Sequence, residues 1–151
     1  MQTFLNLNHS DNEIIYSSEN KTVIQSLEKR VKYLIIYGSN KSGKTTIAKK
    51  FSMNYKVDLI KNVPKDLIFN KETYLDLNTL PAQDENFFHF LQHFITNNIP
   101  LTIFTSENSI DNLNDKFYLP DVVSRLKQFT LCNIHNPGKD LLIKLINKYL
   151  S

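Results

Sequence analysis

The fold of this chain is decided by one stretch, Tyr33-Leu34-Ile35-Ile36-Tyr37-Gly38-Ser39-Asn40-Lys41-Ser42-Gly43-Lys44-Thr45-Thr46. An apolar run over residues 33–37 leads into the pattern Gly-x-x-x-x-Gly-Lys-Thr, and helical periodicity follows from Thr45. A strand that ends in a glycine-rich turn and opens a helix is the setting of a Walker A loop. In such a loop the backbone N–H groups and the helix N-terminus converge on phosphate oxygens. The sequence therefore predicts a nucleotide site here.

The residue types of this loop match the chemistry. Gly38 and Gly43 permit backbone conformations that a Cβ atom would penalise. Lys44 is expected to reach the β- and γ-phosphates, and the Thr45 hydroxyl is expected to ligate Mg²⁺. An incidental glycine loop is the alternative. The residues that we predict to bind ATP or ADP are Gly38, Ser39, Asn40, Lys41, Ser42, Gly43, Lys44, Thr45 and Thr46.

Composition places the chain among globular proteins of one domain. Its 151 residues are 41% hydrophobic and 22% charged, and the net charge of +3 gives no argument for nucleic-acid binding. The single cysteine fits a reducing cytoplasm, and no apolar run is long enough to span a membrane. We expect a cytoplasmic protein without a membrane partner. Residues 1–12 are predicted to be a flexible arm, and residues 13–151 a single nucleotide-binding core.

Strand-like and helical segments alternate along this core, which predicts α/β layers around a mainly parallel sheet. One helix, with an apolar stripe at Phe87, Phe88, Leu91, Phe94 and Ile95, is expected to bury that stripe. Strands are predicted over residues 33–37, 56–60, 73–78, 99–105 and 129–134. Helices are predicted from about residue 17, over 43–54 and 84–97, from residue 120, and over 136–149.

A second candidate site residue, Asp76, lies near the end of the strand predicted over residues 73–78. An acid at the carboxyl end of a parallel strand points into the ligand crevice, and P-loop proteins hold Mg²⁺ with an aspartate there. A turn aspartate is the alternative. Many proteins that hydrolyse nucleotides carry a second acid at the next position, where this chain has Leu77. We therefore expect binding without efficient hydrolysis.

Three further segments resemble one known family, the DnaA-related AAA+ ATPases, and especially the Hda-type regulators of replication initiation. The resemblance covers nearly the entire chain. Residues 85–90 are similar to the family's helix after Walker B, residues 101–107 to its sensor 1 strand, and residues 119–126 to its Leu-Pro-Asp-Leu-x-Ser-Arg-Leu box. The resemblance implies a P-loop AAA+-like three-layer sandwich with a five-stranded parallel sheet of order 5-1-4-3-2.

The resemblance also assigns a role to Arg125, the arginine of the box. In the family this residue is a finger that reaches the nucleotide of a neighbouring subunit. A guanidinium is always charged and planar, which suits it to stabilise phosphoryl oxygens. A surface arginine is the alternative. The implied partner of the Arg125 face is DnaA.

The amino-terminal arm carries the pattern of Gln2, Leu5 and Leu7. It resembles the hexapeptide by which replication proteins, Hda-like proteins among them, dock on the sliding clamp. Alternate apolar side chains would fill pockets while Gln2 adds oriented hydrogen bonds. A disordered terminus, or an apolar segment that packs on the fold, is the alternative.

The chain also departs from this family. It ends at Ser151, one helix after the last predicted strand, so we expect neither the helical lid nor a helix-turn-helix domain, and no sequence-specific DNA binding. Lys127, Gln128 and Phe129 also replace the usual residues after the box. A metal site at His89 and His93 is not expected because no third ligand stands out, and His89 is predicted to be partly buried.

These features together predict an Hda-like regulator that docks on the clamp and promotes hydrolysis of ATP bound to DnaA. Its own site would hold ATP or ADP with Mg²⁺ and turn over little of it. Two alternatives stay open: a small P-loop kinase and a scaffold with a vestigial P-loop. Such kinases need arginine-rich lids, whereas Arg30 and Arg125 are the only arginines of this chain.

Overall fold

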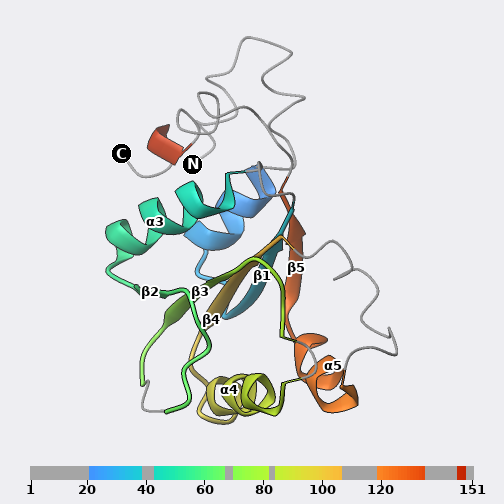
Figure 1. The fold of residues 1–151 in the computed structure, drawn as a ribbon. Helices are drawn as coiled ribbons and strands as arrows, with labels where there is room; N and C mark the ends of the chain where they lie inside the picture. Colours follow the sequence, from blue (N-terminus) through green and yellow to red (C-terminus); the bar gives the residue numbers. More distant parts are fainter. Residues whose placement is uncertain are drawn as a thin grey trace.

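Five parallel strands form one sheet in the order β2-β3-β4-β1-β5, with helices on both faces (Figure 1). This is the order that the family resemblance implied, and the α/β fold class predicted from the sequence is confirmed. The computed structural model describes residues 21–38, 43–66, 70–81, 84–106, 119–134 and 146–148. The strands are β1 (Tyr33–Tyr37), β2 (Asp58–Ile60), β3 (Thr73–Leu77), β4 (Leu101–Thr105) and β5 (Thr130–Asn133).

Helices connect consecutive strands of this parallel sheet, except between β2 and β3, where the described residues form no helix. The helices are residues 21–28, α3 (Lys44–Tyr55), α4 (Glu85–Thr96), α5 (Pro120–Leu126) and a short helical stretch at residues 146–148. Asp84 caps α4, where its carboxylate accepts a hydrogen bond from the N–H of Asn86 at 2.9 Å. Pro120 begins α5 at a position where its missing N–H is harmless.

Strand register brings the carboxyl ends of the strands to one edge of the sheet. Tyr33 in β1 and Thr73 in β3 both pair with Leu101 of β4, so the three central strands begin and end level with one another. β5 then joins the free side of β1. Side chains that follow these strands therefore meet at a common edge, which positions the candidate site.

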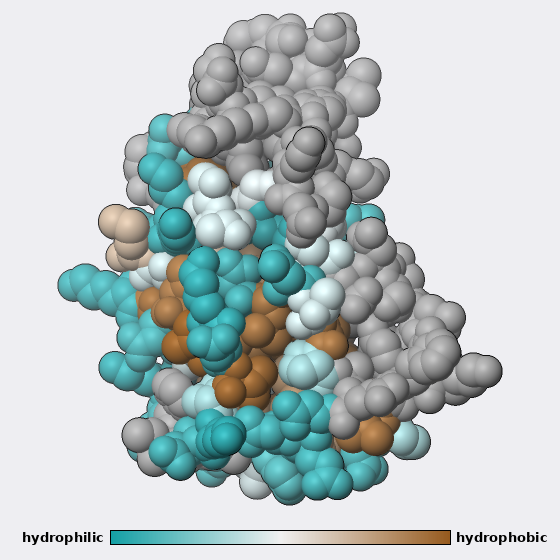
Figure 2. All heavy atoms as spheres, in the orientation of Figure 1, coloured by the Kyte–Doolittle hydropathy of each residue, from teal (hydrophilic) through white to brown (hydrophobic). Residues whose placement is uncertain are grey.

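The core has one cluster on each face of the sheet, because successive side chains of a strand point to opposite faces. Leu34 and Ile36 pack with helix 21–28 and α3, while Ile35 between them packs with α4 and α5. All three are fully buried. Figure 2 shows hydrophobic atoms gathered in the middle of one face of the molecule and hydrophilic atoms over α4.

An ion pair at the opposite, amino edge of the sheet joins three segments. The guanidinium of Arg30, just after helix 21–28, donates to the carboxylate of Glu72, just before β3. The same guanidinium lies 4.3 Å from the ring centroid of Tyr55, the last residue of α3. Arg30 thus stabilises the packing of two helices against the end of the sheet away from the site.

Some predicted boundaries and burials differ from the structure. The strand predicted from Ile99 begins at Leu101, because the Ile99 N–H bonds to the Phe94 carbonyl and Pro100 has no N–H. On α4 the fully buried positions include Phe90, which was not in the predicted stripe, whereas Phe88 is half-buried. The prediction that His89 is partly buried is wrong, since its side chain is exposed.

Other expectations fall on residues outside the description. The arm over residues 1–12, the first residues of the helix expected from about residue 17, and most of the helix over 136–149 are among them. In the part of the chain that is described, no helix combines the length and apolarity needed to cross a membrane.

Candidate nucleotide-binding site

Lys44 is the best-defined side chain of the candidate site. It is the first residue of α3, it is 5% exposed, and its Nζ donates to the carbonyl of Gly38 at 3.0 Å. The lysine therefore spans the two glycine ends of the predicted loop. Burial lowers the pKa of Lys44, and the nearby Asp76 carboxylate opposes that change. A buried amine beside a glycine-rich turn is suited to an anionic ligand.

Gly43 sets the entrance to α3. Its backbone has φ 90° and ψ 15°, in the left-handed region where a Cβ atom is penalised. The Gly43 carbonyl then accepts the first helical hydrogen bond, from the Ile47 N–H at 3.0 Å. The glycine thus turns the chain sharply into a twelve-residue helix, whose N-terminal N–H groups favour negative charge.

The hydroxyl of Thr45 meets the carboxylate of Asp76. Thr45 Oγ1 donates to Asp76 Oδ2 at 3.2 Å, from the first turn of α3 to the carboxyl end of β3. The Nζ of Lys61, which directly follows β2, lies 3.5 Å from the same oxygen. The structure therefore brings together Lys44, Thr45 and Asp76, the three side chains on which the nucleotide prediction depends.

The donor set fits a magnesium–nucleotide complex. A hydroxyl and a carboxylate are hard oxygen ligands of the kind that Mg²⁺ prefers, and Mg²⁺ usually takes its other ligands from water and phosphates. No group of three or more His, Cys, Asp or Glu residues gathers within the described ranges. Thr45 and Asp76 would therefore hold an ion that arrives with a phosphate, which is the usual mode for Mg²⁺ in nucleotide sites.

Leu77 occupies the position where many hydrolysing proteins have a second acid. Its side chain lies on the face of the sheet opposite α3. It packs with the cluster beneath α4, together with Leu75, whereas Tyr74 packs on the α3 face. Beyond it, the Asn78 carbonyl accepts hydrogen bonds from Thr105 Oγ1 at 3.2 Å and from the Ser106 N–H at 3.0 Å. These bonds tie the ends of β3 and β4 together beside Asp76.

Arg125 lies away from this group, on the face of the sheet opposite α3. Its Nε donates to Oε1 of Gln92 in α4, and its guanidinium carbon lies 5.5 Å from the ring centroid of Phe88. The amide of Gln92 in turn donates to Thr96 Oγ1 at 2.7 Å. Figure 1 shows α5 beside α4, with the sheet between them and α3. The structure does not bring Arg125 together with Lys44.

Sequence reasoning missed Lys61 and Gln92. The register of β2 against β3 is what places Lys61 at Asp76, and a three-residue strand gives little sequence signal. Gln92 is a half-buried polar residue of an amphipathic helix, and no sequence motif includes it. Of the predicted residues, those at positions 39–42 and the arm residues Gln2, Leu5 and Leu7 lie outside the description.

Two solved structures have a fold similar to that of this chain. One is a protein described as a candidate primosome component from Streptococcus pyogenes serotype M3, with a TM-score of 0.55 and 18% identity over 91% of this chain and 87% of that chain. The other is DnaI, with a TM-score of 0.50 and 18% identity over 86% of this chain and 89% of that chain. The fold is shared. At this identity the likeness shows a shared α/β fold and does not address the Hda-type regulators specifically.

Comparisons of sequence add nothing to this likeness. No family model matches the chain, and no curated protein matches it either. The roles assigned to individual site residues therefore depend on their geometry in the structure.

Proposed function

We propose that this protein is a nucleotide-binding factor of replication initiation. It holds ATP or ADP with Mg²⁺ at its P-loop, turns over little of it, and promotes hydrolysis of ATP on another AAA+ subunit through Arg125. The observation that carries the nucleotide site is the contact of Thr45 with Asp76 at 3.2 Å beside the buried Lys44. These are the three side chains that P-loop chemistry requires, and they come from separate elements.

Each residue of the site has a defined task in this proposal. Lys44 binds the β- and γ-phosphate oxygens, and the Thr45 hydroxyl with the Asp76 carboxylate holds Mg²⁺. The ion, when bound, neutralises charge that develops on the phosphates. Leu77 offers no carboxylate to orient an attacking water, and its side chain packs on the far face of the sheet. The site is therefore suited to retain a nucleotide more than to hydrolyse it.

The geometry of Arg125 supports action on a second subunit. Its Nε is engaged by Gln92, and among the described residues no acceptor bonds to its two Nη groups. A guanidinium fixed at Nε and open at Nη can present both terminal donors to phosphoryl oxygens. Since its contacts are with α4, we infer that the nucleotide it would reach belongs to another subunit.

The proposed partners come from the sequence resemblance. DnaA would supply the ATP that Arg125 approaches, and Gln2, Leu5 and Leu7 would dock the protein on the sliding clamp. The resemblance of residues 119–126 to the arginine box and of the arm to a clamp-binding hexapeptide supports these partners. Hydrolysis on DnaA would then end its active state after initiation.

A second candidate is a primosome-associated factor, and the structural neighbours favour it. One neighbour is described as a candidate primosome component and the other is DnaI. The nucleotide site proposed here is compatible with either role. The two candidates differ in the partner that responds.

One experiment with the full-length chain separates these roles. Purified protein is mixed with ATP-bound DnaA and DNA-loaded clamp, and phosphate release is followed beside the variant Arg125→Ala. We expect the protein to accelerate release and the variant to lose that effect. No acceleration, or equal acceleration by Arg125→Ala, would exclude the DnaA role. Capture of primosome proteins and not of clamp in a binding assay would favour the second candidate.

A further inference from the structure

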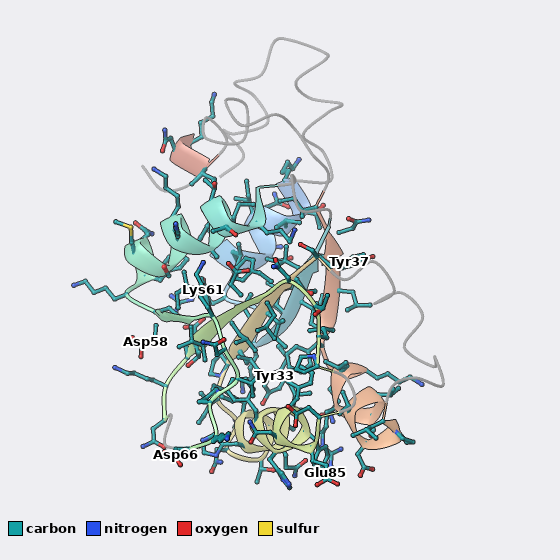
Figure 3. All side chains as sticks on the ribbon, viewed as in Figure 1. Tyr33, Tyr37, Asp58, Lys61, Asp66 and Glu85 are labelled. Carbon is teal, nitrogen blue, oxygen red and sulfur yellow. The ribbon has the colours of Figure 1, made fainter. Side chains whose placement is uncertain are left out.

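The carboxylate of Asp76 has a second neighbour that is no part of the P-loop pattern. Lys61 directly follows β2, and β2 pairs in parallel with β3 so that Ile60 lies opposite Leu75. The next residues, Lys61 and Asp76, therefore lie level with one another. The Lys61 Nζ is 3.5 Å from Asp76 Oδ2. Figure 3 places Lys61 between α3 and the strands, whereas Asp66 and Glu85 lie toward α4.

Lys61 and Thr45 contact the same oxygen of Asp76. Thr45 Oγ1 donates to Oδ2 at 3.2 Å, and the ammonium of Lys61 approaches that atom from the neighbouring strand. A magnesium ion held by Thr45 and Asp76 would bind the same carboxylate that Lys61 contacts. An ammonium is a compact point charge on a flexible stem, so it can occupy a cation position near a carboxylate and leave it again.

The exposure of the two side chains differs in a way that permits this exchange. The side chain of Asp76 is 11% exposed and that of Lys61 is 56% exposed. The carboxylate is therefore held in place, whereas the lysine can turn from Asp76 toward a bound phosphate without disturbing the core. An ion pair with one exposed partner, such as Lys61 with Asp76, contributes little to stability. We therefore look for its role in the position that it has beside Thr45.

The charges of the site point the same way. Lys44 and Lys61 carry two positive charges against the one negative charge of Asp76, and the following residue is Leu77. Because a second carboxylate is missing at that position, these three groups keep a net positive charge of one without a metal ion. A polyphosphate would be attracted to the site even when Mg²⁺ is scarce.

We propose that Lys61 is a resident cation of the phosphate site, which pairs with Asp76 and contacts the terminal phosphate of a nucleotide, so that nucleotide affinity depends only weakly on Mg²⁺. The inference rests on the nucleotide binding proposed above and adds a residue and an ion dependence to it. It predicts that the lysine matters most when the metal is absent.

The test is a comparison of affinities with and without the ion. Binding of a fluorescent ATP analogue to the full-length protein is titrated in saturating Mg²⁺ and in excess EDTA. The quantity compared between variants is the Kd in EDTA divided by the Kd in Mg²⁺. We expect Lys61→Met to increase this ratio about tenfold, the size of one lost charge-assisted contact to phosphate. Lys61→Arg should restore the ratio of the parent protein because it keeps the charge.

A matched control is Lys71→Met. Lys71 also pairs with an aspartate across β2 and β3, at 3.9 Å from Asp58, but at the amino ends of the strands. This variant should leave the ratio unchanged. Thermal unfolding of each variant checks that the fold is kept.

The outcomes separate the two levels of the proposal. A parent protein that binds the analogue in Mg²⁺, with the same ratio for Lys61→Met, would overturn the role of Lys61 and leave the nucleotide site standing. A parent protein that binds the analogue under neither condition would overturn the site and the role of Lys61 together. An increased ratio in Lys61→Met that Lys61→Arg reverses would support the inference.

Discussion

Arg125 is held by Gln92, since the guanidinium Nε of the one donates to the side-chain oxygen of the other across the contact between α5 and α4. Gln92 is itself oriented, because its amide nitrogen donates to Thr96 one turn further along α4. The planar guanidinium also lies near the face of Phe88. The arginine that we propose to act on a partner's nucleotide thus has a fixed direction before any partner arrives.

The first prediction concerns this fixation. Gln92→Ala should reduce the stimulation of partner ATP hydrolysis about three- to tenfold, because the guanidinium loses one anchor and gains rotamer freedom that must be lost again on contact. Arg125→Lys should reduce it at least as much, since an ammonium cannot present paired donors. The measurement is the rate of phosphate release at saturating partner.

Gln128→Ala serves as the matched glutamine control for this prediction. Gln128 is exposed just beyond α5, and its backbone N–H bonds to the Arg125 carbonyl, so the substitution keeps the backbone contact. An equal loss of stimulation in both glutamine variants would show that Gln92 does not act by positioning Arg125.

The second prediction concerns Lys44. Lys44→Ala should weaken ATP binding by about two orders of magnitude, because a buried ammonium makes strong charge-assisted bonds to phosphate oxygens. Isothermal titration in Mg²⁺ measures the loss. Lys49→Ala, an exposed lysine of the same helix, should leave the affinity within about twofold of the parent value. Unchanged affinity in Lys44→Ala would contradict the site.

The third prediction concerns alkaline pH. Burial, with a smaller effect of Glu72, raises the pKa of Tyr74 well above its ordinary value of 10.0. The unfolded chain then releases this proton at lower pH than the folded protein. The contribution to stability is therefore complete below pH 10 and is lost as the pH rises above it.

The variant Tyr74→Phe removes this titration. The free energy of unfolding of the parent protein should fall more steeply above pH 10 than that of the variant, by up to about 1.4 kcal/mol per pH unit. Tyr33→Phe should flatten the curve less, because Tyr33 is only half-buried although burial also raises its pKa. Denaturant titrations across this pH range measure the slopes, and parallel curves for Tyr74→Phe would refute the assignment.

The fourth prediction concerns the end of α3. Lys56 adopts φ 57° and ψ 45° as the residue that ends this helix, a left-handed conformation that favours glycine. Lys56→Gly should therefore raise the free energy of unfolding by about 0.5–1 kcal/mol. Lys50→Gly, in the exposed interior of the same helix, should lower it by about 1 kcal/mol. A loss of stability in both variants would mean that relief of strain at Lys56 is outweighed.

Much of this molecule could be predicted from its sequence, because its elements are marked by strong local patterns. The run from Tyr33 through the glycine loop specifies a strand, a turn and a helix in order, and Asp84 and Pro120 mark helix starts by their cap chemistry. No such local pattern predicted the order of the strands in the sheet. It followed from the resemblance to a family, and the structure confirms it.

The residues that sequence reasoning missed depend on contacts between distant segments. Lys61 reaches Asp76 only because two strands pair in one register, and Gln92 reaches Arg125 only because α4 and α5 pack together. The burial of Phe90 in place of Phe88 has a similar cause, since the packing of α4 on the sheet decides which side of a wide apolar stripe faces inward. No local periodicity encodes such choices.

The two edges of the sheet carry separate duties, and this has a consequence for how the chain can change over generations. The pairing of Arg30 with Glu72 and Tyr55 secures the amino edge, far along the strands from Lys44 and Asp76. Substitutions that remove the nucleotide-binding residues at one edge leave the contacts of Arg30 at the other edge intact. Descendants of this protein could therefore lose nucleotide binding and keep the same fold, which would remain available to bind partner proteins.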